Sequence, residues 1–228
     1  MSTLQPDPVI DTFVDALWLE DGLSRLTLDA YRRDLNGLSR WAAAQGQNLA
    51  TCDTTALQAY FAEQHAQTRA TSVNRRLSVF KRFYRWALRE RIVQADPTLQ
   101  LLSAKTPLRV PKSLTEHQVE LLLAAPNVDT PLGLRDRTMI ELMYASGLRV
   151  SELVGLPVHA VSLNDGALRV LGKGSMERLI PFGEVALDWL QRYLASARPG
   201  ILKGQQTDAL FVTQRGAGMS RVAFWMIV

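Results

Sequence analysis

The chain has 228 residues, of which 47% are hydrophobic, and a formal net charge of +4. This length suits one large or two small domains, and no apolar run approaches the roughly 20 residues that a membrane span needs. The single cysteine, Cys52, excludes an internal disulfide, and the three histidines lack metal-ligand spacing. We therefore expect a cytoplasmic protein that uses no metal or other cofactor.

The charge is unevenly distributed along the chain. Residues 1–21 hold five acidic residues and no Lys or Arg, which is unlike a signal peptide. Residues 69–91 hold eight basic residues and one acidic residue. Such a local concentration of positive charge indicates a polyanionic partner.

The N-terminal half predicts four helices, each with apolar residues at helical spacing. The first spans residues 8–20 and has an acidic outer face, and Gly22 ends it. Ser24 is a suitable N-cap for the second helix, over residues 25–44. A third helix follows over residues 54–64.

The fourth helix, over residues 71–91, has an apolar face and a basic face. At about 100° per residue, its apolar stripe covers an arc of about 80°. The stripe comprises Val73, Leu77, Phe80, Tyr84 and Leu88. The opposite side carries Arg75, Arg82, Arg85 and Arg89, with Lys81 on its flank. An alternative is an ordinary solvated face, although such faces usually mix both signs of charge and here only Glu90 is acidic.

Two arginines of the second helix extend this basic set. Arg32 and Arg33 lie off the apolar stripe of that helix. Together with the basic residues of the fourth helix, they are candidates for binding the phosphate backbone of DNA.

A linker separates this half from the next. Residues 103–113 contain two prolines, three basic residues and almost no core material. We place the domain boundary near residue 107.

The second half combines helices with a small sheet. Overlapping capping boxes open its first helix, and hairpin signals separate its strands. The predicted helices cover residues 116–125, 134–146, 149–155 and 184–197, and the predicted antiparallel strands cover residues 158–163, 167–171 and 178–182. Pro199-Gly200 is expected to end the last of these helices, and residues 220–228 are typical of the start of another.

Two cations in this half are candidates for chemistry. Gly147 is expected to end one helix, and Arg149 then falls in the first turn of the next, where the backbone N–H groups favour an anion. Lys173 lies between two glycines at a hairpin tip, which would hold its side chain out from the sheet. The alternatives are a surface arginine in a tight helix corner and an ordinary turn lysine.

These features occur within longer stretches that resemble the sequences of a known protein family. They include TLDAYRRDL at 27–35, RVPKSLTEHQVELLLAAP at 109–126, LRDRTMIELMYASGLRVSELVGL at 134–156 and the hairpin GKGSMERLIPFGE at 172–184. The chain resembles the tyrosine recombinase (phage integrase-like) family, and within it the Xer chromosome-dimer recombinases. The resemblance covers almost the whole chain.

The resemblance implies a fold and a set of catalytic residues. The fold would be mainly α with a small antiparallel sheet: a SAM-like helical core-binding domain over residues 1–107 and an α+β catalytic domain over residues 108–228. The two domains of the family clamp DNA. Its catalytic residues are two arginines, a lysine, two histidines (or a tryptophan) and a tyrosine nucleophile. The motifs place the first arginine at Arg149 and the lysine at Lys173.

The resemblance also implies partners. They are a double-stranded DNA recombination site, a XerC-like partner recombinase in a heterotetramer and a septal DNA translocase as activator, with no membrane association. Such a protein would act on the nucleoid in the cytoplasm.

The sequence departs from the family in two respects. Ser175 and Met176 stand where the family often has a basic residue after the hairpin lysine. In addition, the HxLRH motif with the second arginine, the second histidine and the nucleophile do not occur in the 228 residues. The tyrosines present are Tyr31, Tyr60, Tyr84, Tyr144 and Tyr193, all in predicted helices.

We therefore expect a chain truncated before the C-terminal catalytic motifs and inactive on its own. Three functions stay open at this point. They are a Xer-type recombinase, a catalytically inactive DNA-binding relic that interferes at a recombination site, and a helical regulator that binds DNA through residues 71–91.

Overall fold

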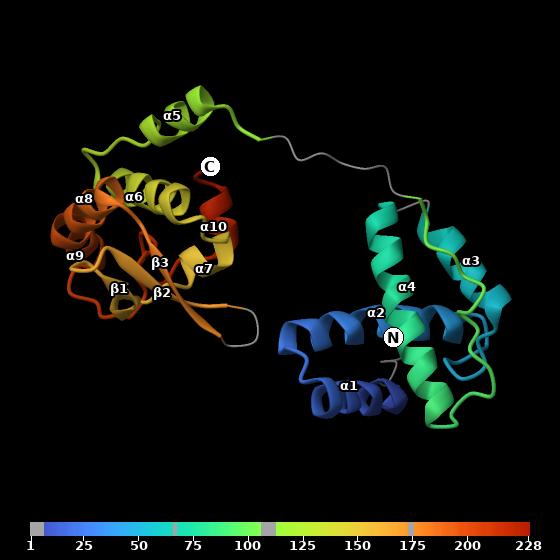
Figure 1. The fold of residues 1–228 in the computed structure, drawn as a ribbon. Coiled ribbons are helices and arrows are strands. Elements are labelled where there is room, and N and C mark those ends of the chain that lie inside the picture. The colour runs from blue at the N-terminus through green and yellow to red at the C-terminus, as the bar shows by residue number, and fades with distance from the viewer. Residues whose placement is uncertain (1–6, 66–67, 106–112, 173–175) are drawn as a thin grey trace. The chain divides into compact units, whose positions relative to one another are not determined.

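The computed structural model describes residues 7–65, 68–105, 113–172 and 176–228. The chain divides into two compact units, Met1–Val110 and Pro111–Val228 (Figure 1). The boundary predicted near residue 107 lies outside the described residues, as does Lys173. No helix among the described residues is both long and apolar enough to cross a membrane.

Four helices build the described part of the first unit. They are α1 (Pro8–Asp21), α2 (Arg25–Ala44), α3 (Thr54–His65) and α4 (Ala70–Arg89). The predicted caps are present: the Ser24 hydroxyl accepts from the Thr27 N–H, and Gly22 adopts a left-handed conformation with φ of 59°. Local capping chemistry thus sets the end of α1 and the start of α2.

A wider face of α4 is buried in the core of this unit than the sequence pattern predicts. Phe83 and Trp86 are buried in addition to four residues of the predicted stripe, because α1, α2 and α3 all contact α4. Phe13 of α1 packs edge-on against Phe83, with ring centroids 5.3 Å apart. The prediction that Leu88 belongs to the core is wrong: it lies in the last turn of α4 and is 41% exposed.

The second unit surrounds a small antiparallel sheet with helices (Figure 1). Its helices are α5 (Glu116–Ala124), α6 (Pro131–Ser146), α7 (Val150–Val154), α8 (Glu184–Arg192), α9 (Arg198–Leu202) and α10 (Arg221–Trp225). Its strands are β1 (Val161–Ser162), β2 (Ala167–Leu171) and β3 (Glu177–Pro181), in the order β1-β2-β3. The mainly α fold class with a small antiparallel sheet is therefore confirmed.

The register of the sheet positions one arginine of the later argument. Val170 of β2 is paired with Arg178 of β3, and Leu168 with Ile180. Directly paired residues point to the same face of a sheet. Leu168 and Val170 are buried in the core of the unit, so Arg178 points to the same side as these core residues.

Two local predictions in this unit are corrected. Residues Val158–Ala160 form a 3₁₀ turn and not the start of a strand. Pro199 does not end the helical run: a π-helical segment, Tyr193–Ala197, joins α8 to α9, and Pro199 falls in the first turn of α9. Proline lacks the N–H of an α-helical hydrogen bond, and here it follows a π-helical turn in which the regular α-helical bonding is already changed.

Candidate functional site

The basic face of α4 begins with an arginine that binds a buried carboxylate. Asp34 of α2 is only 8% exposed, and it accepts hydrogen bonds from both terminal nitrogens of Arg75. The Arg76 Nε lies 3.9 Å from the same carboxylate. Since a buried charge needs a partner, Arg75 has a structural role as well as a surface position.

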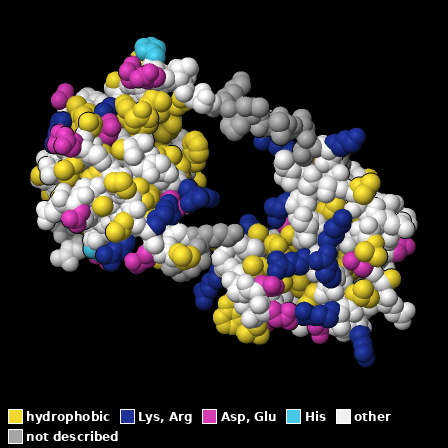
Figure 2. Space-filling view, viewed as in Figure 1, with side chains coloured by type: hydrophobic (Ala, Val, Ile, Leu, Met, Phe, Trp, Pro, Cys, Tyr) yellow, Lys and Arg dark blue, Asp and Glu magenta, His cyan; other side chains and the backbone are white. Residues whose placement is uncertain are grey.

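Two further arginines of the face, Arg82 and Arg89, meet the acidic helix α1. Arg82 donates to Asp21 at 2.7 Å, and Arg89 binds Glu20 through both terminal nitrogens at 2.8 and 2.7 Å. On α2, Arg32 likewise donates to Asp11 of α1, at 3.0 Å. The acidic N-terminal segment and the basic segment therefore neutralise each other in part. Figure 2 shows Asp and Glu side chains beside the Lys and Arg side chains of this unit.

This pairing corrects the interpretation of α4 as a row of free cations. The sequence pattern places charge along one helix, but it gives no information on which other helix lies across from it. Among the described residues, three of the predicted DNA-binding cations form no ion pair with a carboxylate: Arg33, Lys81 and Arg85. Arg85 is exposed on α4, whereas Arg33 donates to the carbonyl of Asp29 within its own helix.

In the second unit, a sharp corner presents Arg149. Gly147 takes φ of 63° and donates to the Met143 carbonyl, which ends α6, and Leu148 is buried beside it. Arg149 is the N-cap residue of α7, one position earlier than the predicted first-turn place. Its side chain is 73% exposed. The buried leucine fixes the backbone while the arginine extends from it.

A carboxylate that the sequence reasoning did not single out anchors this corner. Glu152 accepts from the Arg149 N–H and from the Arg149 guanidinium, both at 2.9 Å. It also accepts from Arg178 of β3 at 2.9 Å, and its own side chain is only 10% exposed. Glu152 thus joins α7 to the sheet. The signal in the sequence is a glutamate three residues after an N-cap, which is the spacing of a capping box.

The environment of Glu152 keeps it ionised. Burial alone would raise the pKa of its carboxyl. The hydrogen bonds from Arg178 and from Arg149 outweigh that effect and lower the pKa to about 2. Glu152 is therefore a fixed negative charge between two arginines, and Arg178 is part of this cluster and not of a surface pair with Glu177.

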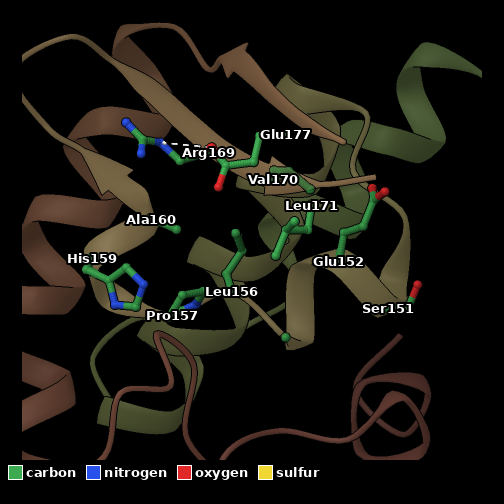
Figure 3. A pocket seen from close by; sticks show the side chains of 11 residues that line it. Ser151, Glu152, Leu156, Pro157, His159, Ala160, Arg169, Val170, Leu171 and Glu177 are labelled. Atoms are coloured by element: carbon green, nitrogen blue, oxygen red, sulfur yellow. Dashed lines mark ion pairs between the residues drawn. The ribbon is translucent and has the colours of Figure 1, made fainter. Parts of the chain in front are cut away.

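A hollow of about 350 Å³ lies behind this corner, bounded by α7, the 3₁₀ turn and strands β2 and β3. Figure 3 shows Glu152 at one end of it and His159 at the other. Arg169 and Glu177 form an ion pair beside it at 3.9 Å. Its walls include Leu156, Pro157 and Ala160. Arg149 does not line this hollow.

The tyrosines of the chain are mostly structural. The Tyr84 hydroxyl donates to the Leu49 carbonyl at 2.9 Å, and the Tyr193 hydroxyl donates to the Leu210 carbonyl at 3.0 Å. Both are buried, and burial raises the pKa of Tyr193 to about 12. Tyr60 is also buried, whereas Tyr144 on α6 is 63% exposed. Arg198 is structural too, since its guanidinium donates to the backbone carbonyls of Thr207, Ala209 and Leu210.

Comparison with family profiles assigns both parts of the chain. Residues 112–228 match the phage integrase family, and residues 10–91 match the N-terminal SAM-like domain of phage integrases. Together the two matches cover most of the described residues.

Curated relatives match along nearly the full chain. The tyrosine recombinase XerD of Ralstonia nicotianae is 58% identical over 220 residues, which cover 96% of this chain and 71% of the relative. The XerD of Pseudomonas aeruginosa is 50% identical over 228 residues, which cover 99% of this chain and 76% of the relative. These matches confirm the resemblance to Xer recombinases that the motifs indicated, and they narrow it to XerD.

Solved structures share the fold. A λ integrase dimer bound to a COC′ core site aligns with a TM-score of 0.68 at 18% identity, covering 96% of this chain and 61% of that one. The Tn1549 transposon integrase in complex with circular intermediate DNA aligns with a TM-score of 0.68 at 18% identity, covering 96% and 77% of the two chains. At this identity the likeness supports the fold.

Proposed function

Because the chain belongs to the phage integrase family of tyrosine recombinases, we propose that it acts at a DNA recombination site in site-specific recombination of the Xer type. In this reaction a tyrosine attacks a DNA phosphodiester, the 5′-oxygen leaves, and the covalent 3′-phosphotyrosine conserves the bond energy for religation. The reaction resolves chromosome dimers before cell division. The observation that carries the proposal is the Arg149–Glu152 pair within a matching motif.

Arg149 is proposed to bind the scissile phosphate. In the pentavalent transition state, negative charge gathers on the non-bridging oxygens, and a guanidinium can stabilise it with two parallel hydrogen bonds. Glu152 holds both the backbone N–H and the guanidinium of Arg149, so the side chain is oriented before DNA arrives. We assign Glu152 as a positioning residue because it acts through Arg149.

Lys173 is proposed to protonate the departing 5′-oxygen as a general acid. Its side chain lies outside the described residues, so the proposal rests on the hairpin motif alone. The hairpin itself joins β2 to β3, and Arg178 of β3 binds the same carboxylate as Arg149. The lysine-bearing hairpin and the arginine corner are therefore connected through Glu152.

The first unit is proposed to bind the DNA backbone. Arg33, Lys81 and Arg85 are the predicted cations without a carboxylate partner among the described residues, so they are the strongest candidates for phosphate contacts. A XerC-like recombinase and a septal DNA translocase are the proposed protein partners. In this proposal the protein works on the chromosome, in the nucleoid.

A second candidate function follows from the tyrosines. The hydroxyls of Tyr84 and Tyr193 are committed to backbone carbonyls inside the core, and Tyr60 is buried. We propose that the 228-residue chain alone forms no phosphotyrosine. It would then act as a DNA-binding protein that occupies a recombination half-site or interferes with an active copy.

A suicide substrate separates these two functions. The chain would be incubated with a nicked duplex that carries a Xer-type site, and covalent protein–DNA adducts would be separated on a denaturing gel. We expect no adduct but a gel shift that prefers the site over random duplex. An adduct that is lost in the Tyr144→Phe variant would identify the exposed Tyr144 as a nucleophile. It would reject the proposal that the chain alone forms no phosphotyrosine. Equal binding to random duplex would reject site recognition.

A further inference from the structure

A second basic feature of the first unit lies beside the buried Asp34. Helices α2, α3 and α4 enclose a hollow of about 460 Å³. Its lining includes Arg33 and Arg40 from α2 and Arg76 from α4. Arg40 and Arg76 were not among the residues that the sequence singled out, because they flank their helices and come together only in the folded unit.

The charge balance of this hollow is positive. Its one lining carboxylate is Asp34, and Arg75 already binds both oxygens of that group from outside the hollow. Among the described residues, Arg33 and Arg40 form no ion pair, and their Nε atoms donate only to carbonyls of their own helix. Glu63 lies nearby, where it accepts from the Trp41 indole at 2.8 Å, but it does not line the hollow. Two guanidinium groups, those of Arg33 and Arg40, therefore line the hollow without an ion-pair partner, and Arg76, whose Nε lies 3.9 Å from the shared Asp34, adds a third positive charge.

Neutral donors complete the lining. Gln64 accepts from Arg76 through its side-chain oxygen, which leaves its amide NH₂ as a donor. Tyr60 is only 3% exposed, and its hydroxyl makes no hydrogen bond with the described residues although it lies 3.5 Å from the Cβ position of Gly37. Tyr60 lines the hollow, and a tyrosine hydroxyl without a protein partner can donate to a ligand there. Charged and neutral donors thus converge on one space.

We propose that this hollow binds a phosphate group of the DNA backbone. A phosphodiester oxygen accepts several hydrogen bonds at once, and arginine is the side chain best suited to donate to it. The proposal rests on the proposed function, because it adds one phosphate contact to the DNA interface of the first unit. It differs from the face of Arg82 and Arg89, which is neutralised by α1.

Gly37 offers a test that changes no charge. It lies in the lining, and an alanine Cβ there would meet the Tyr60 hydroxyl at an ordinary contact distance. Gly37→Ala therefore leaves the hollow open, whereas Gly37→Leu would fill it. Both changes raise helix propensity, so neither is expected to unfold α2. The alanine variant is the matched control.

The measurement is fluorescence anisotropy of a labelled duplex at several salt concentrations. For Gly37→Leu we expect the slope of log affinity against log salt to fall by about one, with a roughly tenfold weaker affinity near physiological salt. Gly37→Ala should match the parent chain. If both variants bind like the parent, the hollow takes no phosphate although the proposed function stands. If the parent chain binds no duplex, the proposed function and this inference both fail.

Two further arms identify the group that binds. Arg40→Gln should reduce the slope as Gly37→Leu does, whereas Arg25→Gln, at the start of the same helix, should reduce it less; an equal effect would attribute the loss to net charge and reject the site. The second arm is an NMR titration with inorganic phosphate alone. Its binding would be observed at the indole N–H resonance of Trp41, which lines the hollow. A shift of that resonance with an unchanged Gly37→Leu slope would mean a free-phosphate site and overturn the assignment to DNA.

Discussion

Glu20 and Arg89 lie 69 residues apart in the sequence and form a two-point ion pair between the ends of α1 and α4. The glutamate oxygens accept from the two terminal nitrogens of the arginine at 2.7 and 2.8 Å. A phosphate would use the same nitrogens. The carboxylate therefore occupies the donors that the proposed phosphate contact would use, and under that proposal α1 competes with DNA for the basic face of α4.

The first prediction is that Glu20→Gln tightens DNA binding. A neutral amide releases Arg89 for a phosphate, so the slope of log affinity against log salt should steepen by about one. We expect an affinity several-fold higher at low salt. Fluorescence anisotropy with a labelled duplex would measure both quantities.

Asp15→Asn is the matched control for this prediction. Asp15 lies on the exposed side of the same helix and forms no ion pair among the described residues, and its replacement changes the net charge equally. It should raise affinity only slightly and leave the slope nearly unchanged. Equal effects of the two substitutions would show that net charge, and not the pair with Arg89, controls binding.

Helix ends in the first unit could be predicted from the sequence, but the ion-pair partners of the helices could not. The ends of α1 and α2 follow from Gly22 and Ser24, since capping is a local interaction between near neighbours. The partners of Arg89 and Arg82 could not be predicted in this way. They depend on which helix packs across from α4, and that is decided by core residues such as Phe13 and Phe83.

The second prediction separates stability from binding on α4. Arg85→Gln should weaken DNA binding and leave the free energy of unfolding within about 0.5 kcal/mol, because the side chain is exposed. Arg75→Gln should lower that free energy by roughly 1–3 kcal/mol, because it removes the bidentate partner of the buried Asp34. Urea unfolding and anisotropy on the same two variants would test this. The interpretation of α4 fails if Arg85→Gln leaves DNA affinity unchanged.

The candidate site in the second unit was predicted in part. The corner that presents Arg149 could be predicted because Gly147 and Leu148 are its neighbours in sequence, whereas the role proposed for Arg149 came from the family resemblance. The hydrogen bond from Arg178 to Glu152 could not be predicted. These residues are 26 positions apart, and they meet only because the sheet register pairs Val170 with Arg178. A sequence pattern of alternating strand residues gives the two faces of a strand but not its neighbour in the sheet.

The third prediction concerns the arginine corner. Arg149→Gln should change the free energy of unfolding by less than about 0.5 kcal/mol, because the side chain is 73% exposed. Glu152→Gln should lower it by roughly 1–3 kcal/mol, because a side chain that is 10% exposed loses charge-assisted bonds to two arginines. Thermal or urea unfolding would measure both. Comparable losses in the two variants would contradict the role of Glu152 as the anchor of the corner.

The last prediction is a pH dependence that arises from the same glutamate. In the folded chain the pKa of Glu152 is about 2, below its ordinary value of 4.5. A group whose pKa is lowered on folding adds stability above its unfolded pKa, and loses it as the pH falls toward the folded value. The difference in unfolding free energy between the parent chain and Glu152→Gln should therefore be constant from neutral pH down to about 5, and then shrink below about 4.5. Urea unfolding of both chains across this range would record the difference, and a carboxyl carbon titration by NMR would follow Glu152 directly. A titration midpoint near 4.5 would mean that Arg149 and Arg178 do not hold this carboxylate, and Arg149 would then lack its positioning partner.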